Sequence, residues 1–370
     1  MVVKLKVEII DVDFQALPQL QQKWSELELK ASNSIFTSWH WINTWLQFVE
    51  YKTQLLTVTY HGKIVGLAFV IHNSQSKYGI QANQLWLNRT GNTSFDQIWN
   101  EYNDILCEKG LEYSIRSAVL EYFEKNLATI DEFIIGVSNK KISETPFSNK
   151  LMQYTSWKTT SYSTNLTAEY AKWSEYLQSL SKNTRNQIKR SAKLFGGIEN
   201  ISLTPAKTTH QAIEYFNAAG KFHKLRWVDQ NSGFQNEHFI NFHQQFIENN
   251  FTSGYIDIIK IHIKDKTICY LYNLIYKDTV YFYLSGIEYG YDNRFKPGLL
   301  SHSLATSHYA KLGYKKYDFM GGEGRYKNSL SDNKSEMIIS NFRRKTLPFI
   351  TSHFLRQAKS SALKLAKRFD

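Results

Sequence analysis

The sequence predicts a mixed α/β fold organised in two halves. At 370 residues the chain exceeds the roughly 100–200 residues of one average domain. Segments with the apolar spacing of helices intermix with alternating, strand-like segments, which is typical of helices packed on a sheet. A polar stretch over residues 138–163 separates two such patterns, so we expect two consecutive domains.

The first half begins with helices and continues into a hairpin. Two alternating runs flank His61-Gly62, which predicts a tight turn between strands. The stretch 138–163 then has the Ser, Thr, Lys and Asn content of a linker with short strands, and it contains Pro146. The expected helices cover residues 20–29, 39–49 and 113–126, and the expected strands cover residues 54–60, 63–71, 84–87 and 132–137.

The second half repeats the order of helices followed by strands, as a tandem duplication would after sequence drift. The expected helices cover residues 182–194, 210–224, 237–249 and 299–310, and the expected strands cover residues 256–263, 267–276, 280–285 and 317–320. We therefore expect an N-terminal domain over residues 1–163, including the linker 138–163, a C-terminal domain over residues 164–345, and a basic amphipathic helix over residues 346–370.

A basic turn before the helix at residue 299 is a candidate anion site. Arg294 and Lys296 precede Pro297-Gly298, and Leu299 begins the apolar pattern of the helix. A helix N-terminus offers unpaired N–H groups and partial positive charge, and Gly298 lets an anion approach the main chain. Arg294, Lys296, Gly298 and Leu299 are therefore predicted to hold a pyrophosphate. An ordinary capped helix after a basic loop is the alternative from these residues alone.

A second informative stretch follows the strand that ends at Met320. Glycines at 321, 322 and 324 bracket Glu323, and Arg325, Tyr326 and Lys327 come next. Such glycines permit unusual backbone angles and hold one carboxylate close to other parts of the chain. A flexible loop with a solvated Glu and Lys is the structural alternative.

Read together, these stretches resemble the C-terminal half of GNAT-superfamily acyltransferases of the CelD-like type, relatives of the Fem aminoacyltransferases. Earlier segments add to the resemblance, which covers about residues 30–345: an aromatic helix at 36–45, a hairpin at 60–66, an acidic box Glu101-Tyr-Asn-Asp104, a basic helix start at 180–190 and the box His223-Lys-Leu-Arg-Trp227. The family implies two tandem GNAT-like domains, each a mostly antiparallel sheet flanked by helices.

The resemblance also implies the reaction, which is direct transfer of an acyl group from acyl-CoA, most simply acetyl-CoA, to an amine. A carboxylate or imidazole near the amine would remove its proton, and Glu323 is our first candidate and His223 the second. Lys327, Tyr326 and Arg185 would bind or orient the reactants. Spacing alone does not separate a base from a substrate-binding carboxylate.

Arg226 and Trp227 are further candidates for substrate binding, because a guanidinium can bind an anion through two N–H groups and an indole offers a stacking surface. Tyr102 and Asp104 of the acidic box are candidates as well. Several of the candidates also have a purely structural explanation. The histidine at the helix end could bond to a carbonyl, the basic face around Arg185 could simply be solvated, and Asp104 could cap a turn.

Charge and composition limit the partners. The formal net charge of +12 favours an anionic partner, for which acyl-CoA, nucleotide-linked sugars, anionic lipids and tRNA all qualify. The basic helix 346–370 could contact a membrane surface peripherally or pack on the body of the protein. The sequence contains no long apolar run or signal-peptide core, so we expect a cytoplasmic protein. Cys107 and Cys269 and the histidines lack metal-ligand spacing, so we expect no metal.

Two other functions stay open from the sequence. A Fem-like enzyme would take its aminoacyl group from tRNA, which a basic surface suits. A non-catalytic protein would use the same fold to bind an anionic glycan or a membrane surface. For the acyl-CoA enzyme, family habit suggests a small or nucleotide-linked amine acceptor, such as an amino sugar of a surface-polysaccharide or cell-envelope pathway.

Overall fold

The computed structural model describes residues 4–77, 80–226, 232–290 and 292–346. The expected C-terminal helix over 346–370 and the expected stacking residue Trp227 therefore fall outside the described residues, apart from residue 346.

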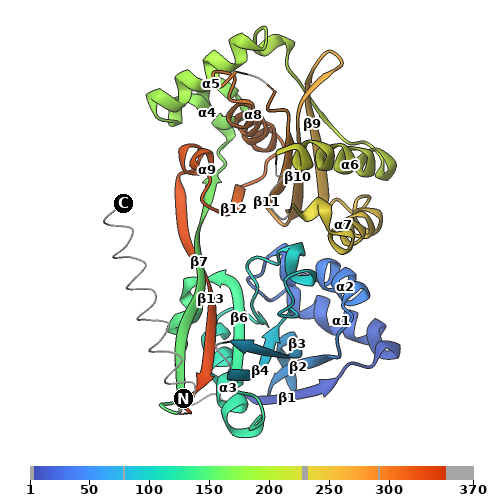
Figure 1. Cartoon of the computed structure of the whole chain (residues 1–370), viewed down its shortest axis with the longest axis vertical. Coiled ribbons are helices and arrows are strands. Elements are labelled where there is room, and N and C mark those ends of the chain that lie inside the picture. The colour runs from blue at the N-terminus through green and yellow to red at the C-terminus, as the bar shows by residue number, and fades with distance from the viewer. Residues whose placement is uncertain (1–3, 78–79, 227–231, 291, 347–370) are drawn as a thin grey trace.

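Strands from both halves form one continuous sheet, which confirms the predicted mixed α/β class (Figure 1). Within the described residues, thirteen strands are assigned: β1 (Lys6–Asp11), β2 (Thr53–Tyr60), β3 (Lys63–Lys77), β4 (Ile80–Leu87), β5 (Leu106–Cys107), β6 (Glu132–Asn139), β7 (Leu151–Asn165), β8 (Ser202–Pro205), β9 (Ile256–Ile263), β10 (Lys266–Tyr276), β11 (Thr279–Ile287), β12 (Lys316–Gly321) and β13 (Asn333–Arg344). Their order is β1-β2-β3-β4-β6-β13-β7-β12-β11-β10-β9-β8, with β5 paired to β3.

Helices cover both faces of this sheet. The α-helices of the described residues are α1 (Leu17–Glu28), α2 (Trp39–Phe48), α3 (Glu112–Asn126), α4 (Trp173–Ser179), α5 (Lys182–Leu194), α6 (Thr209–Arg226), α7 (Glu237–Asn250), α8 (Pro297–Lys311) and α9 (Arg325–Leu330). Short 3-10 helices join them: η1 (Phe14–Ala16), η2 (Ile35–Thr37), η3 (Phe95–Ile98), η4 (Lys140–Glu144), η5 (Ala168–Ala171), η6 (Ile198–Asn200) and η7 (Gly233–Gln235).

The two halves repeat one topology. In each half, a run of antiparallel strands is followed by an α-helix and then by one more strand. This last strand pairs in parallel with a strand that precedes the helix. The pair is β4 and β6 around α3 in the first half, and β11 and β12 around α8 in the second. Each parallel pairing covers three residues on each strand, and the two strands then separate. This repetition is the pattern that a tandem duplication predicts.

Strands β7 and β13 connect the halves and run side by side through the middle of Figure 1. β13 pairs with β6 of the first half, and β7 pairs with β12 of the second. The stretch 138–163, expected to be a linker with short strands, thus contains the end of β6, η4 and most of the 15-residue strand β7. Both partners of β7, β12 and β13, lie far away in the sequence, so no local sequence pattern predicts these pairings.

A shared core fixes the two halves against each other. The fully buried side chain of Trp41 on α2 packs edge-on against Phe242 and Phe246 on α7, with ring centroids 5.0 and 5.2 Å apart. Aromatic pairs of this geometry add to the stabilisation from burial alone. Loops of the first half are therefore held at defined positions over the second half.

Among the helices of the described residues, none combines the length and apolarity that a membrane-spanning segment needs.

Candidate active site

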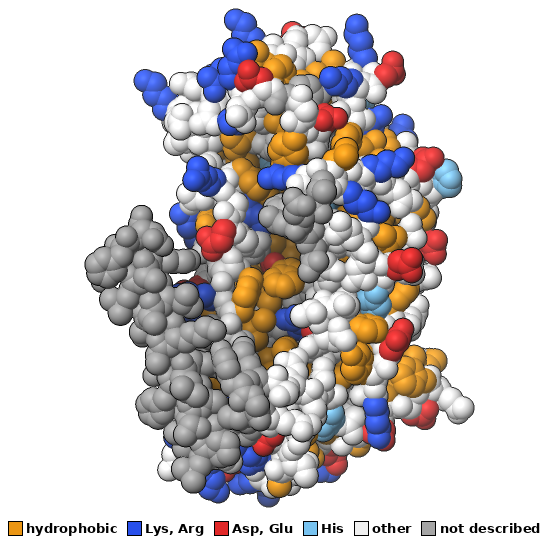
Figure 2. Space-filling model, in the orientation of Figure 1, with side chains coloured by type: hydrophobic (Ala, Val, Ile, Leu, Met, Phe, Trp, Pro, Cys, Tyr) orange, Lys and Arg blue, Asp and Glu red, His pale blue; other side chains and the backbone are white. Residues whose placement is uncertain are grey.

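The largest cavity of the site opens where β11 and β12 separate. Pairing between these strands stops at Tyr281 and Asp318, so the edge of β11 beyond Tyr281 faces a cavity of about 1080 Å³. Its walls come from α6, β11, the loop before α8, the first turn of α8 and residues 322–329. Figure 2 shows hydrophobic side chains in a hollow near the middle of this face. We call this space the donor cavity.

The N-terminus of α8 forms one wall of the donor cavity. Pro297, Gly298 and Leu299 all line it, together with Lys296, the N-cap residue. No side chain caps this helix, and its first turn contains no acidic residue. The N–H groups of Gly298 and Leu299 and the positive end of the helix dipole therefore favour an anion at this wall.

Two other basic residues of this region, Arg294 and Arg185, do not line the donor cavity. Arg294 is exposed, forms an ion pair with Asp292 at 3.0 Å and is not among the lining residues. On α5, Arg185 donates a hydrogen bond to the Gln178 carbonyl at 3.3 Å, while Asn183 and Gln187 line the cavity. Of the two cations expected to hold the pyrophosphate, Arg294 and Lys296, Lys296 lines the cavity.

A second, smaller cavity of about 270 Å³ adjoins the first, and we call it the acceptor cavity. Both cavities share the walls His223, Phe282–Leu284 and Lys327. The remaining walls of the acceptor cavity come from both halves: Gln97, Trp99 and Glu101 from the first, and Gly233, Phe234, Phe239, Met320 and Gly321 from the second. Clefts between domains are common sites for ligands.

Glu101 is the buried carboxylate of the acceptor cavity, with 2% of its surface exposed. It accepts hydrogen bonds from the Gly321 N–H at 2.9 Å and from the Trp99 indole N–H at 2.6 Å. Burial raises the pKa of Glu101 above its ordinary value, although these two donors and Lys327 oppose the rise. A carboxylate with a raised pKa in a cleft is the kind of group that serves as a general base.

Lys327 and His223 stand where the two cavities meet. The Lys327 ammonium donates a hydrogen bond to the Gly321 carbonyl, and burial lowers its pKa. His223 Nδ1 lies 2.8 Å from Ser232 Oγ, and burial, together with Arg226, lowers the His223 pKa to about 4. The imidazole is therefore uncharged at neutral pH.

Tyr326 and Arg226 line the donor cavity only. The Tyr326 ring stacks on the buried His302 of α8, with centroids 5.0 Å apart, and burial raises the Tyr326 pKa above its usual range. The Arg226 guanidinium lies over the ring of Tyr289 at 4.1 Å, a cation–π contact at the wall of the cavity.

Glu323 is an exposed carboxylate of the donor cavity. It follows Gly322, which has a φ of 126°, and lines the donor cavity but not the acceptor cavity. The candidate bases Glu323 and Glu101 thus differ in burial and in the cavity that they face. The sequence predicted Glu101 only as a member of the acidic box 101–104, because the surrounding stretch 96–104 is mostly polar and does not mark one carboxylate as buried.

Unusual backbone angles surround Glu101. Trp99, Tyr102 and Met320 have φ values of 47°, 50° and 60°, in the left-handed region that bulky residues seldom adopt. Each such residue costs on the order of 1–3 kcal/mol, and such residues cluster at functional sites. The strained residues lie on both chain segments that meet at the acceptor cavity.

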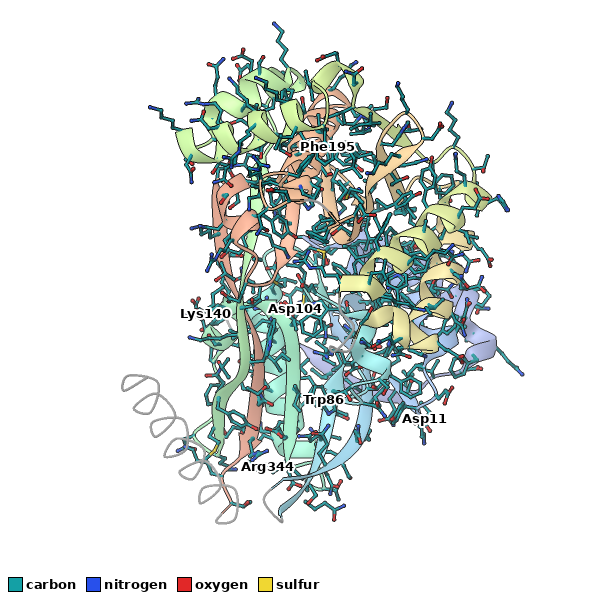
Figure 3. The ribbon with its side chains drawn as sticks, turned by 45° about the horizontal axis from the view of Figure 1, so that its top comes forward. Asp11, Trp86, Asp104, Lys140, Phe195 and Arg344 are labelled. Atoms are coloured by element: carbon teal, nitrogen blue, oxygen red, sulfur yellow. The ribbon has the colours of Figure 1, made fainter. Side chains whose placement is uncertain are left out.

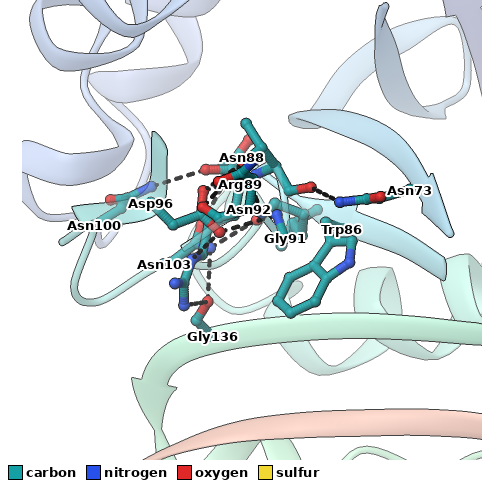
Figure 4. Close-up of polar contacts among 12 residues, drawn as sticks. Asn73, Trp86, Asn88, Arg89, Gly91, Asn92, Asp96, Asn100, Asn103 and Gly136 are labelled. Carbon is teal, nitrogen blue, oxygen red and sulfur yellow. Dashed lines mark hydrogen bonds and ion pairs between the residues drawn. The ribbon is translucent and has the colours of Figure 1, made fainter. Parts of the chain in front are cut away.

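A buried amide network holds the loop that presents Glu101 (Figure 4). Asn103 is fully buried and donates to the Leu87 and Gly136 carbonyls at 2.7 and 3.0 Å, and it accepts from Asn88 at 3.0 Å. Asp96 accepts from the Gly91 N–H and pairs with Arg89 at 3.3 Å. This network joins the ends of β4 and β6, so the loop fills the place where those strands separate in the first half.

Tyr102 and Asp104 face a different space, a cavity of about 580 Å³ between the halves. The Tyr102 hydroxyl donates to Asp318, 2.9 Å from both carboxylate oxygens, and Asp104 forms an ion pair with Arg116 at 2.9 Å. Figure 3 shows Asp104 near the middle of the molecule. The structure therefore does not bring these two residues into the donor or acceptor cavity.

Comparison with known proteins agrees with this architecture. Residues 182–328 match the model of a family described as an acetyltransferase (GNAT) domain. No curated protein matches the sequence significantly.

Solved structures share the fold of nearly the whole chain. FemX is 9% identical, with a TM-score of 0.57 over 93% of this chain and 99% of its own. L-PGS from Bacillus licheniformis is 8% identical, with a TM-score of 0.52 over 94% and 97%. A protein of unknown function from Bacteroides thetaiotaomicron is 12% identical, with a TM-score of 0.53 over 92% and 100%. Residues 182–328 thus match an acetyltransferase (GNAT) domain, within a chain that shares its overall fold with FemX.

Proposed function

We propose that the protein is an acyl-CoA-dependent N-acyltransferase, most simply an N-acetyltransferase, whose reaction takes place in the second half. The observation that carries this proposal is the separation of β11 from β12 beside an uncapped helix N-terminus. The open strand edge offers hydrogen bonds to an amide-containing chain, and the helix N-terminus offers a site for a pyrophosphate. CoA contains both groups in sequence.

In this proposal Lys296, Gly298 and Leu299 hold the pyrophosphate at the start of α8. The acyl thioester supplies a carbonyl carbon that an uncharged amine attacks, with formation of the C–N bond and departure of the thiol. The shared walls of the two cavities lie where these reactants would meet. Arg294 and Arg185 lie further from the cavity and would act on the donor mainly through their charge.

Glu101 is the residue that we propose as the general base. An ammonium must lose a proton before its nitrogen can attack, and the Glu101 carboxylate faces the acceptor cavity with a raised pKa. The proton moves from nitrogen to a Glu101 oxygen, and each oxygen has lone pairs left after its existing hydrogen bond. Lys327 stabilises the carboxylate through its charge, and neutral His223 can accept a hydrogen bond from the amine. Glu323 is the alternative base.

Isothermal titration calorimetry with CoA and with aminoacyl-tRNA tests the donor. We expect saturable CoA binding that Lys296→Ala weakens. Binding of aminoacyl-tRNA with no binding of CoA would contradict the proposal.

The second candidate is a Fem-like transferase that uses aminoacyl-tRNA. Its support is the fold shared with FemX and the net charge of +12, which suits an RNA donor. A third candidate, a non-catalytic binder of anionic glycans or membrane surfaces, requires ligand binding without turnover. Release of free CoA that depends on Glu101 excludes both.

The proposal also keeps three predictions that rest on sequence alone. Two of these are a cytoplasmic location and peripheral membrane contact through residues 346–370. The third, an amino sugar of a surface-polysaccharide or cell-envelope pathway as acceptor, is the alternative that the acceptor test below compares with an apolar amine.

A further inference from the structure

We propose that the acceptor is a compact primary amine whose nitrogen is attached to an apolar carbon skeleton of about one ring in size. This inference rests on the proposed function, because it concerns the second substrate of the same site. It narrows the acceptor from amines in general to a class that the acceptor cavity can recognise.

Size is the first argument. The acceptor cavity has a volume of about 270 Å³, just below the roughly 300–1,000 Å³ of most small-molecule sites. An apolar cavity of about 150 Å³ is known to hold benzene. The reacting end of the acceptor is therefore comparable to a single ring with a short substituent.

The walls are the second argument. The cavity is lined by the aromatic residues Trp99, Phe234, Phe239, Phe282 and Tyr283, together with Leu284 and Met320. Rings of this kind bury apolar carbon and attract a cation through their faces.

Trp99 is held rigidly among these walls. Its N–H donates to Glu101, and its ring packs edge-on against Trp157 with centroids 5.2 Å apart. Arg89 lies 5.9 Å from the Trp99 ring on a further side. A ring fixed by three contacts loses little freedom when a ligand packs against it.

The distribution of charge is the third argument. Glu101 is the carboxylate that lines the acceptor cavity, and it is almost fully buried. An ammonium beside Glu101 gains a charged partner in a setting of low dielectric, whereas a neutral group does not. The cation of the same wall, Lys327, is already bonded to the Gly321 carbonyl.

Several polar side chains of the cavity already have hydrogen-bond partners within the protein. The Lys327 ammonium is bonded to the Gly321 carbonyl, and the Tyr283 hydroxyl contacts the Ile98 carbonyl and His243. Asn236 donates to the Gln97 side-chain carbonyl at 2.8 Å. Buried hydroxyls without partners are costly, so a polyhydroxylated ring fits these walls less well than an apolar one.

Three small probes test the inference in the full chain: benzylamine, its neutral analogue benzyl alcohol, and glucosamine as a polyhydroxylated amine. We expect calorimetry without any donor to give at least tenfold tighter binding of benzylamine than of benzyl alcohol. With acetyl-CoA present, we expect a kcat/KM for benzylamine at least tenfold above that for glucosamine, measured as release of free thiol.

Two variants separate charge from shape. Glu101→Gln should remove the preference for benzylamine over benzyl alcohol, whereas Glu101→Asp should keep it, because the negative charge remains. Circular dichroism tests whether each variant is folded. If Glu101→Gln does not fold, the comparison of benzylamine with benzyl alcohol in Glu101→Asp is decisive.

Several results would overturn the inference. These are equal binding of benzylamine and benzyl alcohol by the unmodified protein, a glucosamine kcat/KM equal to or above that of benzylamine, or acyl transfer to none of the amines while CoA binds. Absence of CoA binding contradicts the proposed function instead, and the donor-free comparison of benzylamine with benzyl alcohol still decides the inference.

Discussion

Glu101 and Lys327 bind opposite ends of the same residue, Gly321. The Gly321 N–H donates to the Glu101 carboxylate at 2.9 Å, and the Gly321 carbonyl accepts from the Lys327 ammonium. One peptide segment thus links an acidic residue of the first half to a basic residue of the second. This arrangement joins the two halves where the donor and acceptor cavities meet.

Replacement of Glu101 by Gln should lower kcat by about 10²-fold or more, the usual contribution of a general base. Donor affinity, measured by calorimetry with CoA, should stay unchanged because Glu101 does not line the donor cavity. Glu323→Gln is the matched control, with an expected change of less than about threefold. The reverse result, a large loss from Glu323→Gln and none from Glu101→Gln, would make Glu323 the base.

The same assignment predicts a pH dependence. The base form of Glu101 is the carboxylate, and burial raises its pKa. Activity should therefore fall as the pH decreases through that raised pKa, at a higher pH than for an ordinary exposed Glu. A profile of kcat/KM against pH measures this limb, which reports groups of the free enzyme and substrate. A profile that stays flat down to the range of exposed carboxylates would argue against Glu101.

At the start of α8, Lys296→Ala should weaken CoA binding by about tenfold, equivalent to about 1.4 kcal/mol. Arg294→Ala should have a smaller effect, because Arg294 is exposed and pairs with Asp292. Calorimetry at two salt concentrations distinguishes direct contact from general charge, since salt screens exposed charges strongly. Equal effects from both variants would contradict a direct role for Lys296.

The amide network behind Glu101 gives a prediction on stability and activity together. Asn103→Ala removes the hydrogen bonds that Asn103 donates to the buried Leu87 and Gly136 carbonyls, which should cost about 1–3 kcal/mol of unfolding free energy. Activity should fall as well, because Asn103 is two residues from Glu101. Asn126→Ala, at an exposed helix end, is the control with an expected change within about 0.5 kcal/mol. Urea unfolding with parallel kinetics measures both effects.

Close packing of β11 on α6 supplies a test outside the cavities. A Cβ at Gly286 would lie 2.4 Å from the backbone of Ala219, so Gly286→Ala forces the helix and strand apart. The expected destabilisation is about 1–3 kcal/mol. At Gly290 the nearest atom to a new Cβ is the movable Glu288 carboxylate, so Gly290→Ala should be nearly neutral. Similar melting temperatures for the two variants would show that the contact at Gly286 relaxes easily.

Local patterns were enough to predict most elements of the fold. The helix predicted over 182–194 and the strand predicted over 256–263 match α5 and β9. The start of α5 carries a Ser cap, and β9 has the alternating isoleucines of a strand. β7 is polar and rich in Thr and Ser, and β13 lies about 180 residues away in the sequence. Their pairing depends on tertiary structure and could not be predicted from either segment alone.

The residues of the candidate site also differ in whether the local sequence predicts them. The turn from Lys296 to Leu299 and the segment around Lys327 carry strong local signals, and both line the donor cavity. Glu101 lies far from both in sequence, and the fold brings it to Gly321. Tyr102, its neighbour, faces the other cavity because the backbone turns sharply there, with a φ of 50°. The resemblance to the acidic box therefore pointed to the loop 101–104, but it did not show which side chain of this loop lines the acceptor cavity.

The most direct measurement is a crystal structure of the protein with bound CoA. The account predicts that the pantetheine chain lies along β11 beyond Tyr281, that the pyrophosphate contacts the N–H groups of Gly298 and Leu299, and that the thiol points toward the cavity lined by Glu101. CoA bound elsewhere on the protein, or a donor cavity that stays empty at saturating CoA, would contradict the account.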